Sequence, residues 1–169
     1  MEFLVNKKVT DISAGRKMSG AVTQSGEAWL WGELPNGSSQ ACFKISATSV
    51  GVGWNFAVFG LEEECMMVDE VMDLRSIGSV KVKELDCGDS HAVVMSEEGR
   101  VFSVGTGEVG QLGLGSSMLS VSSLTEVAFP GVAGKVLASN EFSVALSQSS
   151  VYVWGLVNPK QLEAQTRKF

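Results

Sequence analysis

Short apolar runs alternate with polar, glycine-containing turns along much of the chain, and the clearest example lies between residues 85 and 115. Ala92 to Met95 is a continuous apolar run, Ser96 to Gly99 is a polar turn that ends in glycine, and residues 100–104 mix polar and apolar side chains. Short runs bounded by turn residues are typical of β-strands. This stretch therefore predicts a β-hairpin, and it is the template for the rest of the chain.

Glycines follow this hairpin at intervals of two or three residues, from Gly105 to Gly115. Glycine at this density weakens both helices and strands, so the segment predicts a tight loop. Gly105-Thr-Gly-Glu-Val-Gly110 also fits the dinucleotide-binding pattern, in which glycines join a strand to a helix. We reject that alternative because the next residues, Gln-Leu-Gly-Leu-Gly-Ser-Ser, cannot start a helix and no strand–helix–strand unit surrounds them.

Weaker copies of the hairpin recur on both sides of the template. When Gly15 is aligned with Gly88, Gly26 falls on Gly99 and Gly32 on Gly105 without a gap. A second copy aligns Gly53 with Gly88, and a fourth aligns Ser139 with it. The predicted repeats cover about residues 9–32, 45–68, 80–115 and 132–155.

The template resembles the repeat of the regulator of chromosome condensation family. The resemblance rests on Gly88-x-x-His91, Gly99 and Gly105-x-Gly-x-x-Gly-Gln-Leu-Gly-x-Gly, and on Trp-Gly pairs at 31–32 and 154–155. It implies that each repeat builds one blade of a β-propeller. The positions to which it gives a structural role are Gly15, Gly26, Gly32, Gly53, Gly88, His91, Gly99, Gly105, Gly110, Gln111, Gly113, Trp154 and Gly155.

The predicted fold is all-β: a partial or small β-propeller of about four blades in residues 1–155, followed by a short polar tail, 156–169. The intervals from the first repeat to the second and from the second to the third are shorter than the interval from the third to the fourth. We therefore expect the first two blades to have lost loops or outer strands. An arc of four blades leaves an apolar face uncovered at each end. We therefore expect self-association, docking on a partner, or capping by the tail.

Composition agrees with this fold class. The 169 residues are 44% hydrophobic and include 19 glycines but only 3 prolines, which favours a β protein with many turns and a sizeable core. A net charge of −6 argues against direct binding of nucleic acid, which depends on clustered Lys and Arg. With neither a secretory signal nor a membrane-spanning stretch recognised, we expect an intracellular protein, cytoplasmic or nuclear.

The sequence offers few groups for catalysis or metal binding. Cys42, Cys65 and Cys87 have neither disulfide-framework nor zinc-site spacing, so we expect reduced, buried thiols and neither metal nor cofactor. His91 is the one histidine and the only candidate general base. Asp89 could form a couple with it in an extended strand, but we favour packing or loop hydrogen bonding for His91. Met18, Phe56 and Phe142 occupy the same repeat position, which indicates apolar surroundings.

Acidic residues gather in two equivalent hairpin turns, at 62–64 and 97–98. They are either solvated turn residues or an acidic rim that steers a basic partner. The candidate partner-binding residues are Glu62, Glu63, Glu64, Asp89, Glu97, Glu98 and Glu108.

Three functions remain open. Rigid blades with exposed loops favour a non-catalytic protein-interaction module, which could scaffold or regulate a small GTPase or another partner. The family resemblance implies guanine-nucleotide exchange on a Ran-like small GTPase as an alternative. A third alternative is a fragment of a longer repeat protein, because repeat units need neighbours to bury their faces.

Overall fold

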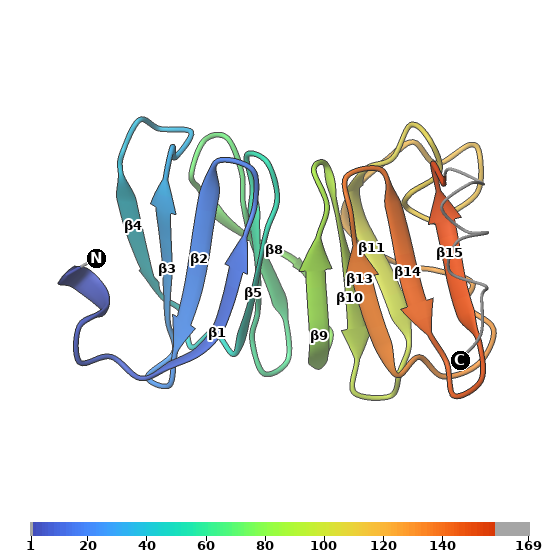
Figure 1. Cartoon of the computed structure of the whole chain (residues 1–169), viewed down its shortest axis with the longest axis horizontal. Coiled ribbons are helices and arrows are strands. Elements are labelled where there is room, and N and C mark those ends of the chain that lie inside the picture. The colour runs from blue at the N-terminus through green and yellow to red at the C-terminus, as the bar shows by residue number, and fades with distance from the viewer. Residues whose placement is uncertain (1, 158–169) are drawn as a thin grey trace, which may run out of the picture.

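Four antiparallel β-sheets stand side by side in the computed structural model, which describes residues 2–157 (Figure 1). We call them blades 1 to 4 in chain order. Blade 1 holds β1 (Val9–Ala14), β2 (Met18–Thr23), β3 (Glu27–Gly32) and β4 (Gln40–Lys44). Blade 2 holds β5 (Ser49–Val52), β6 (Ala57–Gly60), β7 (Cys65–Val68) and β8 (Leu74–Gly78). Blade 3 holds β9 (Val82–Cys87), β10 (His91–Ser96), β11 (Val101–Thr106) and β12 (Ser120–Glu126). Blade 4 holds β13 (Lys135–Ala138), β14 (Phe142–Leu146) and β15 (Val151–Gly155).

The strands of each blade follow one another in chain order, so every blade is a simple antiparallel meander. The first strands, β1, β5, β9 and β13, contact one another from blade to blade and form the inner layer of the arc. The all-β prediction and the four blades are confirmed. The predicted tail, 156–169, lies almost wholly outside the described residues.

Of the two losses expected for the first two blades, loops or outer strands, the structure agrees with the first and not with the second. Blades 1 and 2 have short connections but keep their outer strands, β4 and β8, so no outer strand was lost from them. The Ser-rich stretch after the template also contains an outer strand, β12, where no strand was predicted from the sequence. β4 and β12 escaped notice because all their residues are exposed or half-buried, which leaves little hydrophobic signal.

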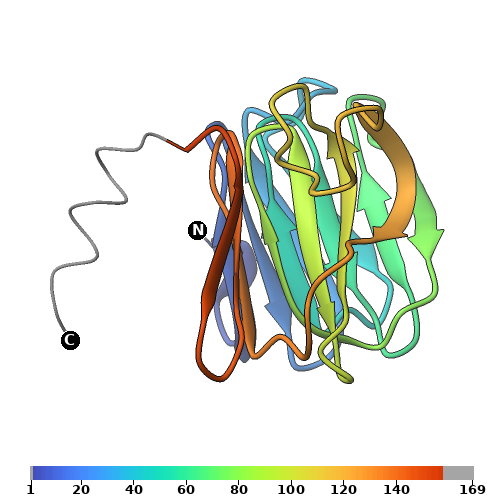
Figure 2. The same cartoon turned by 90° about the vertical axis from the view of Figure 1, so that its right-hand side faces the viewer.

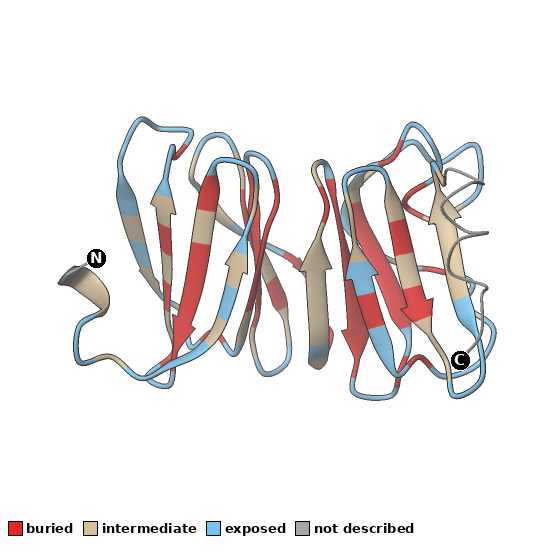
Figure 3. Ribbon diagram, in the orientation of Figure 1, coloured by how far each residue is buried: buried red, intermediate tan, exposed pale blue. Residues whose placement is uncertain are grey.

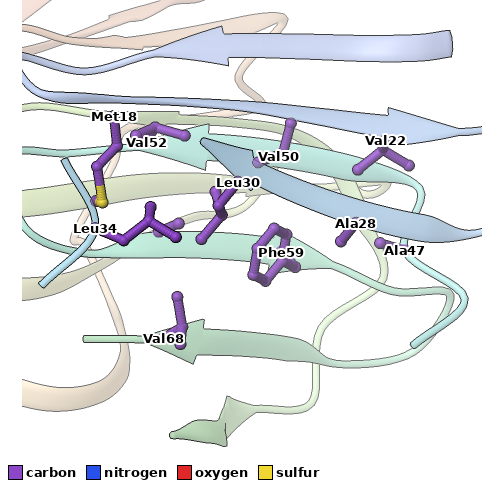
Figure 4. Packing of buried hydrophobic residues seen from close by; sticks show 11 residues of the cluster. Met18, Val22, Ala28, Leu30, Leu34, Ala47, Val50, Val52, Phe59 and Val68 are labelled. Atoms are coloured by element: carbon purple, nitrogen blue, oxygen red, sulfur yellow. The ribbon is translucent and has the colours of Figure 1, made fainter. Parts of the chain in front are cut away.

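The apolar core lies between neighbouring blades, where one face of each sheet packs on the next (Figure 3). Between blades 1 and 2, Val22 and Leu30 of blade 1 pack with Val50 and Phe59 of blade 2, and none of these side chains is more than 3% exposed (Figure 4). Full burial of a side chain such as Phe59 contributes about 2 kcal/mol. Sheet-on-sheet burial therefore holds the arc together.

The turn at Gly99 shows why the repeat requires glycine there. Its φ is +76°, and a Cβ atom would lie 2.8 Å from the carbonyl oxygen of Ala133 in the connection to blade 4. The carbonyl of Gly99 also accepts a hydrogen bond of 2.9 Å from the amide of Ala133. The turn thus fixes where the next blade starts.

A segment before the first strand covers the outer face of blade 1, the face that points away from blade 2. The short 3-10 helix Glu2–Leu4 places the ring of Phe3 against that of Trp29, with ring centroids 5.2 Å apart. Lys7 forms an ion pair with Glu27 and lies over the Trp29 ring. Blade 1 therefore does not leave this face bare.

Candidate functional site

Equivalent turns from all four blades meet at one end of the inner layer, which we call the β1–β2 turn end. They surround a hollow of about 650 Å³. Each blade contributes the residues that join its first strand to its second: Gly15 and Arg16, Gly53, Gly88 and Asp89, Ser139 and Asn140. The hollow therefore results from the repeat itself, while the side chains around it differ from blade to blade.

Arg16 and Trp54 give this end its most distinctive surface. The Arg16 guanidinium carbon lies 4.9 Å from the centre of the Trp54 ring, and Trp54 is 45% exposed. The amide of Trp54 donates a hydrogen bond of 3.1 Å to the carbonyl of Asp89, which ties the turn of blade 2 to that of blade 3. A large aromatic ring is thus held at the surface by a rigid backbone.

The backbone of the four turns is closely packed. A Cβ atom on Gly88 would collide with the carbonyl oxygen of Ser139 and would lie 2.8 Å from Nδ1 of His91. Glycine at this repeat position lets the turn of one blade touch that of the next.

Side chains of the inner strands tie two of the three blade interfaces. Asp11 and Ser13 of β1 accept hydrogen bonds from the amides of Val50 and Val52 in β5, at 2.8 and 3.0 Å. At the same repeat positions, Glu84 and Asp86 of β9 accept from the amides of Val136 and Ala138 in β13, at 3.1 and 2.8 Å. Burial raises the pKa of the Asp86 carboxyl despite its hydrogen bonds to the amides of Ala138 and Cys87.

The interface between blades 2 and 3 lacks these ties. Its equivalent positions are Ser49, whose hydroxyl has no hydrogen-bond partner among the described residues, and Gly51. Blade 4 carries Lys135 and Leu137 there, so it offers no carboxylate or hydroxyl to a following sheet. Tied and untied blades thus alternate along the arc.

His91 is fully buried between blades 3 and 4. Its Nε2 lies 2.8 Å from Oγ of Ser143, and that hydroxyl donates to the carbonyl of Gln111 at 2.8 Å. Because Ser143 uses its proton on Gln111, His91 must donate from Nε2, which leaves Nδ1 unprotonated and without a partner among the described residues. Burial lowers the pKa of His91 to about 4, more strongly than the charge of Asp89 raises it.

The Asp89–His91 couple considered from the sequence is not formed by a hydrogen bond. Asp89 lies in the turn before β10 and is half-buried, whereas the ring of His91 points to Ser143 in blade 4. His91 therefore has the contacts of a packing residue in the blade interface.

The glycine-rich loop after β11 closes the same interface. Gly110 and Gly113 have positive φ, and the buried Gln111 between them accepts a second hydrogen bond, 2.9 Å long, from Nε1 of Trp154. The residues that follow form turns and then β12, not the helix that a dinucleotide site would need.

The acidic candidates divide between two ends of the sheets. Glu62 to Glu64 and Glu97 to Glu98 lie in the β6–β7 and β10–β11 turns, at the end opposite the hollow, whereas Asp89 and Glu108 lie at the β1–β2 turn end. Lys81 is 3.6 Å from Glu63, and its carbonyl accepts from the amide of Glu97. The seven residues therefore do not form one surface, and a role for them in partner binding stays a prediction.

The cysteines differ from one another. Cys65 is buried, and burial raises the pKa of its thiol to about 12; the pKa of Cys87 is also raised by burial. Cys42 is exposed, so the prediction of a buried thiol was wrong for this residue. It lies on the outer strand β4, which the sequence had not revealed. Within residues 2–157, no three His, Cys, Asp or Glu side chains are grouped to hold a metal ion.

Sequence reasoning missed Arg16, Trp54, Ser143 and the inner-strand acids Glu84 and Asp86. Trp54 carried a weak signal, since tryptophan is rarely buried completely. The acids carried none, because their partners are main-chain amides 52 residues away. In the described part of the chain, no helix is long and apolar enough to cross a membrane.

Comparisons with known proteins agree with this architecture. Residues 82–111 match the model of the regulator of chromosome condensation (RCC1) repeat. The ultraviolet-B receptor UVR8 of Arabidopsis thaliana is 33% identical over 86 residues, which cover 50% of this chain and 20% of the receptor. Yeast RCC1 (Prp20) bound to Kap60 aligns with a TM-score of 0.76 at 18% identity, covering 93% of this chain and 44% of that one.

A second structure, Prp20p from Saccharomyces cerevisiae, aligns with a TM-score of 0.73 at 20% identity and again covers 93% of this chain and 45% of the other. The chain thus spans less than half of these solved structures and a fifth of the plant receptor. The four sheets match part of a propeller, and the template repeat contains the matched residues. Residues 82–111 therefore form a regulator of chromosome condensation repeat, within a set of four sheets that matches part of the RCC1 propeller.

Proposed function

We propose that the chain is a non-catalytic protein-interaction module that binds a protein partner at the β1–β2 turn end. One observation carries the proposal: Trp54 is 45% exposed, and its ring centre lies 4.9 Å from the guanidinium carbon of Arg16, which lines the hollow. Tryptophan and arginine dominate the binding energy of protein interfaces. The hydrogen bond from the Trp54 amide to the Asp89 carbonyl orders the backbone that carries the ring, and the Arg16 guanidinium contacts the ring itself, so less order has to be created on association.

The partner class that we propose first is a small GTPase. Its support is the structural similarity to Prp20p, whose structure was described together with its binding to Gsp1p and histones. The net charge of −6 argues against a surface for nucleic acid.

Binding to a purified Ran-like GTPase, measured by interferometry, tests the proposal. We expect Trp54→Ala to weaken the complex about tenfold or more, since removal of such a residue typically costs at least 2 kcal/mol. A matched control, Glu63→Gln with Glu97→Gln, alters the opposite end and should leave the affinity unchanged. Loss of binding in the control with full binding by Trp54→Ala would reject the β1–β2 turn end and favour the acidic turns.

Guanine-nucleotide exchange is the second candidate, favoured by the same similarity to Prp20p. Release of a fluorescent GDP analogue from the GTPase separates the two functions. If the chain is an interaction module, it should bind the GTPase without accelerating the release of the GDP analogue. Acceleration that disappears in Trp54→Ala would instead identify an exchange factor that works through this surface.

The chain could also be one part of a longer repeat protein, as its coverage of 44% of yeast RCC1 allows. The intact mass of the native protein, measured in its own cells, decides this point. A mass that matches the 169 residues would exclude a larger native form, and a greater mass would establish one.

A further inference from the structure

A second pocket at the β1–β2 turn end lies over the junction of blades 1 and 2 and has a volume of about 710 Å³. We call it the junction pocket. Blade 1 contributes Leu34 and Pro35 from the β3–β4 loop, which lies at the upper end of the sheets in both views (Figure 1 and Figure 2). Blade 2 contributes Trp54 and Asn55 from the β5–β6 turn and Glu70 from the β7–β8 turn. The volume is in the range of pockets that hold ligands.

The junction pocket has an apolar part that is held in place. Leu34 is 4% exposed and belongs to the core cluster between blades 1 and 2. The amide of Gly37 donates to the carbonyl of Leu34 at 2.9 Å, and the amide of Glu33 donates to the carbonyl of Lys17 at 3.0 Å. The half-exposed ring of Trp54 adds an aromatic surface. An entering side chain therefore meets apolar surface that is already ordered.

The pocket also carries one net negative charge. Lys17 and Glu33 lie 2.9 Å apart as an ion pair and neutralise each other. Glu70 is exposed and accepts a hydrogen bond from the side-chain amide of Asn55, which has no charge. Within residues 2–157, Glu70 takes part in none of the ion pairs. A carboxylate without a described cation thus lies in the same pocket as an aromatic ring.

The contact between Arg16 and Trp54 indicates where a second cation would bind. Arg16 lines the first hollow, and its guanidinium carbon lies 4.9 Å from the centre of the Trp54 ring. Because a positive charge already contacts this ring, another cation is better placed at the carboxylate of Glu70 than over the ring. The apolar stem of such a side chain would then lie against Leu34 and Pro35.

We propose that the junction pocket binds a lysine or arginine side chain of a protein partner, with the aliphatic stem against Leu34 and Trp54 and the charged head at Glu70. Lysine and arginine bury their stems along apolar surface while the head keeps polar contacts. An acidic side chain would be repelled by Glu70, and a wholly apolar one would remove water from this carboxylate without replacing it. The proposal rests on the proposed function, since it names the partner chemistry recognised at the β1–β2 turn end.

Butylguanidinium, which has the head and stem of arginine, tests the pocket in the full-length chain. Its binding is followed by the indole N–H signal of Trp54 in proton–nitrogen NMR spectra at constant ionic strength, with the signal assigned from the Trp54→Phe variant. We expect a saturable shift of this signal with butylguanidinium, a weaker one with the neutral isostere butylurea, and none with pentanoate. Absence of a shift with butylguanidinium, or equal affinity for butylurea or pentanoate, would overturn the proposal.

Glu70→Gln isolates the role of the charge, because glutamine keeps an oxygen that accepts from Asn55. The variant should weaken butylguanidinium binding about threefold, as expected for an exposed ion pair. Glu62→Gln is the matched control, since Glu62 is also exposed and lies at the opposite end of the same blade. It should leave the affinity unchanged. Equal weakening by the two variants would show that the cation responds only to the net charge of the chain, which would overturn the site.

The same variants in the assay with the Ran-like GTPase separate this proposal from the proposed function. Affinity about threefold weaker in Glu70→Gln, and unchanged in Glu62→Gln, would support a basic side chain of that partner in the pocket. Full affinity in Glu70→Gln with a loss in Trp54→Ala would overturn the pocket as a contact and leave the proposed function standing. If the GTPase does not bind at all, the proposed partner class is wrong, and the butylguanidinium titration alone decides on the pocket.

Discussion

Nε2 of His91 in blade 3 lies 2.8 Å from Oγ of Ser143 in blade 4, and both side chains are fully buried. One interface earlier, the equivalent repeat positions hold Phe56 and Ala92, which belong to one apolar core cluster. The interface between blades 3 and 4 is thus specified by a polar pair, and its energy can be measured by exchanging the pair for the apolar one.

Ser143→Ala should lower the free energy of unfolding by about 1–3 kcal/mol, because it leaves the Nε2–H of His91 buried without an acceptor. His91→Phe alone should change the stability little, since Ser143 still donates to Gln111. The double variant should be more stable than Ser143→Ala, as the Phe56–Ala92 pair predicts. Urea unfolding of the four proteins gives the coupling energy, and additive losses would contradict the pairing.

Stability should fall when the pH drops from about 6.5 to about 4. The pKa of His91 is about 4 in the folded chain, whereas an unperturbed histidine, as in the unfolded chain, has a pKa of 6.5. Between these two pH values the unfolded state therefore binds more protons than the folded state. The stabilisation is fully present above pH 6.5, and ~3 kcal/mol is lost by pH 4.

The His91→Phe/Ser143→Ala variant isolates this effect. The raised pKa of the Asp86 carboxyl acts in the opposite direction, but it is present in both proteins and cancels in their difference. Urea unfolding at pH 7.5 and 4.5 should show a larger loss for wild type than for the variant. Equal losses would show that His91 is protonated without penalty in the folded state.

Gly99→Ala should destabilise the chain by more than Gly37→Ala. The two glycines have nearly the same φ, +76° and +79°, so the strain of placing a side chain there is matched at about 1 kcal/mol. A Cβ at Gly37 meets nothing within 4 Å, whereas one at Gly99 meets the backbone of Ala133. Thermal unfolding compares the two, and Gly99→Val should cost on the order of 1–3 kcal/mol. Equal losses of stability in Gly99→Ala and Gly37→Ala would mean that the connection from blade 3 to blade 4 shifts to accommodate the Cβ atom at no cost.

Asp86→Ala should loosen blade 4 from blade 3. It removes the acceptor of the Ala138 amide, so that amide should exchange hydrogen faster than in wild type. Ser49→Ala, at the position in blade 2 that Glu84 occupies in blade 3, removes a hydroxyl without a described partner and should change neither exchange nor stability. Faster exchange of the Ala138 amide in both variants would show that the effect is not specific to the hydrogen bond between Asp86 and Ala138.

The sequence alone predicted the blades wherever a strand is buried on both faces. All six residues of β10 are buried, and the glycines around it mark turns with positive φ, so both the hydrophobic and the turn signals were strong. The outer strands β4 and β12 were missed because one of their faces is solvated and their pairing is set by neighbours already in place.

The candidate site was harder to predict, because it depends on which blades are adjacent. Nothing within the fourth repeat shows that Ser143 pairs with His91, which lies 52 positions earlier. Arg16 and Trp54 are likewise brought together by the packing of blade 1 on blade 2. Repeat alignment identifies equivalent positions, but contacts between different positions in neighbouring blades appear only in three dimensions.

The alternation of ties along β1, β5, β9 and β13 divides the arc into two halves. Blades 1 and 2 share two hydrogen bonds from inner-strand side chains, as do blades 3 and 4, while β5 offers β9 only the unpaired Ser49 and the bare backbone of Gly51. Arg75 donates a hydrogen bond to the carbonyl of Ser122 and joins the two halves at the outer rim, and the amide of Trp54 donates to the carbonyl of Asp89 and joins them at the β1–β2 turn end. Local opening should therefore begin on the inner side between β5 and β9, so that each pair of blades moves as one cooperative unit about the rim.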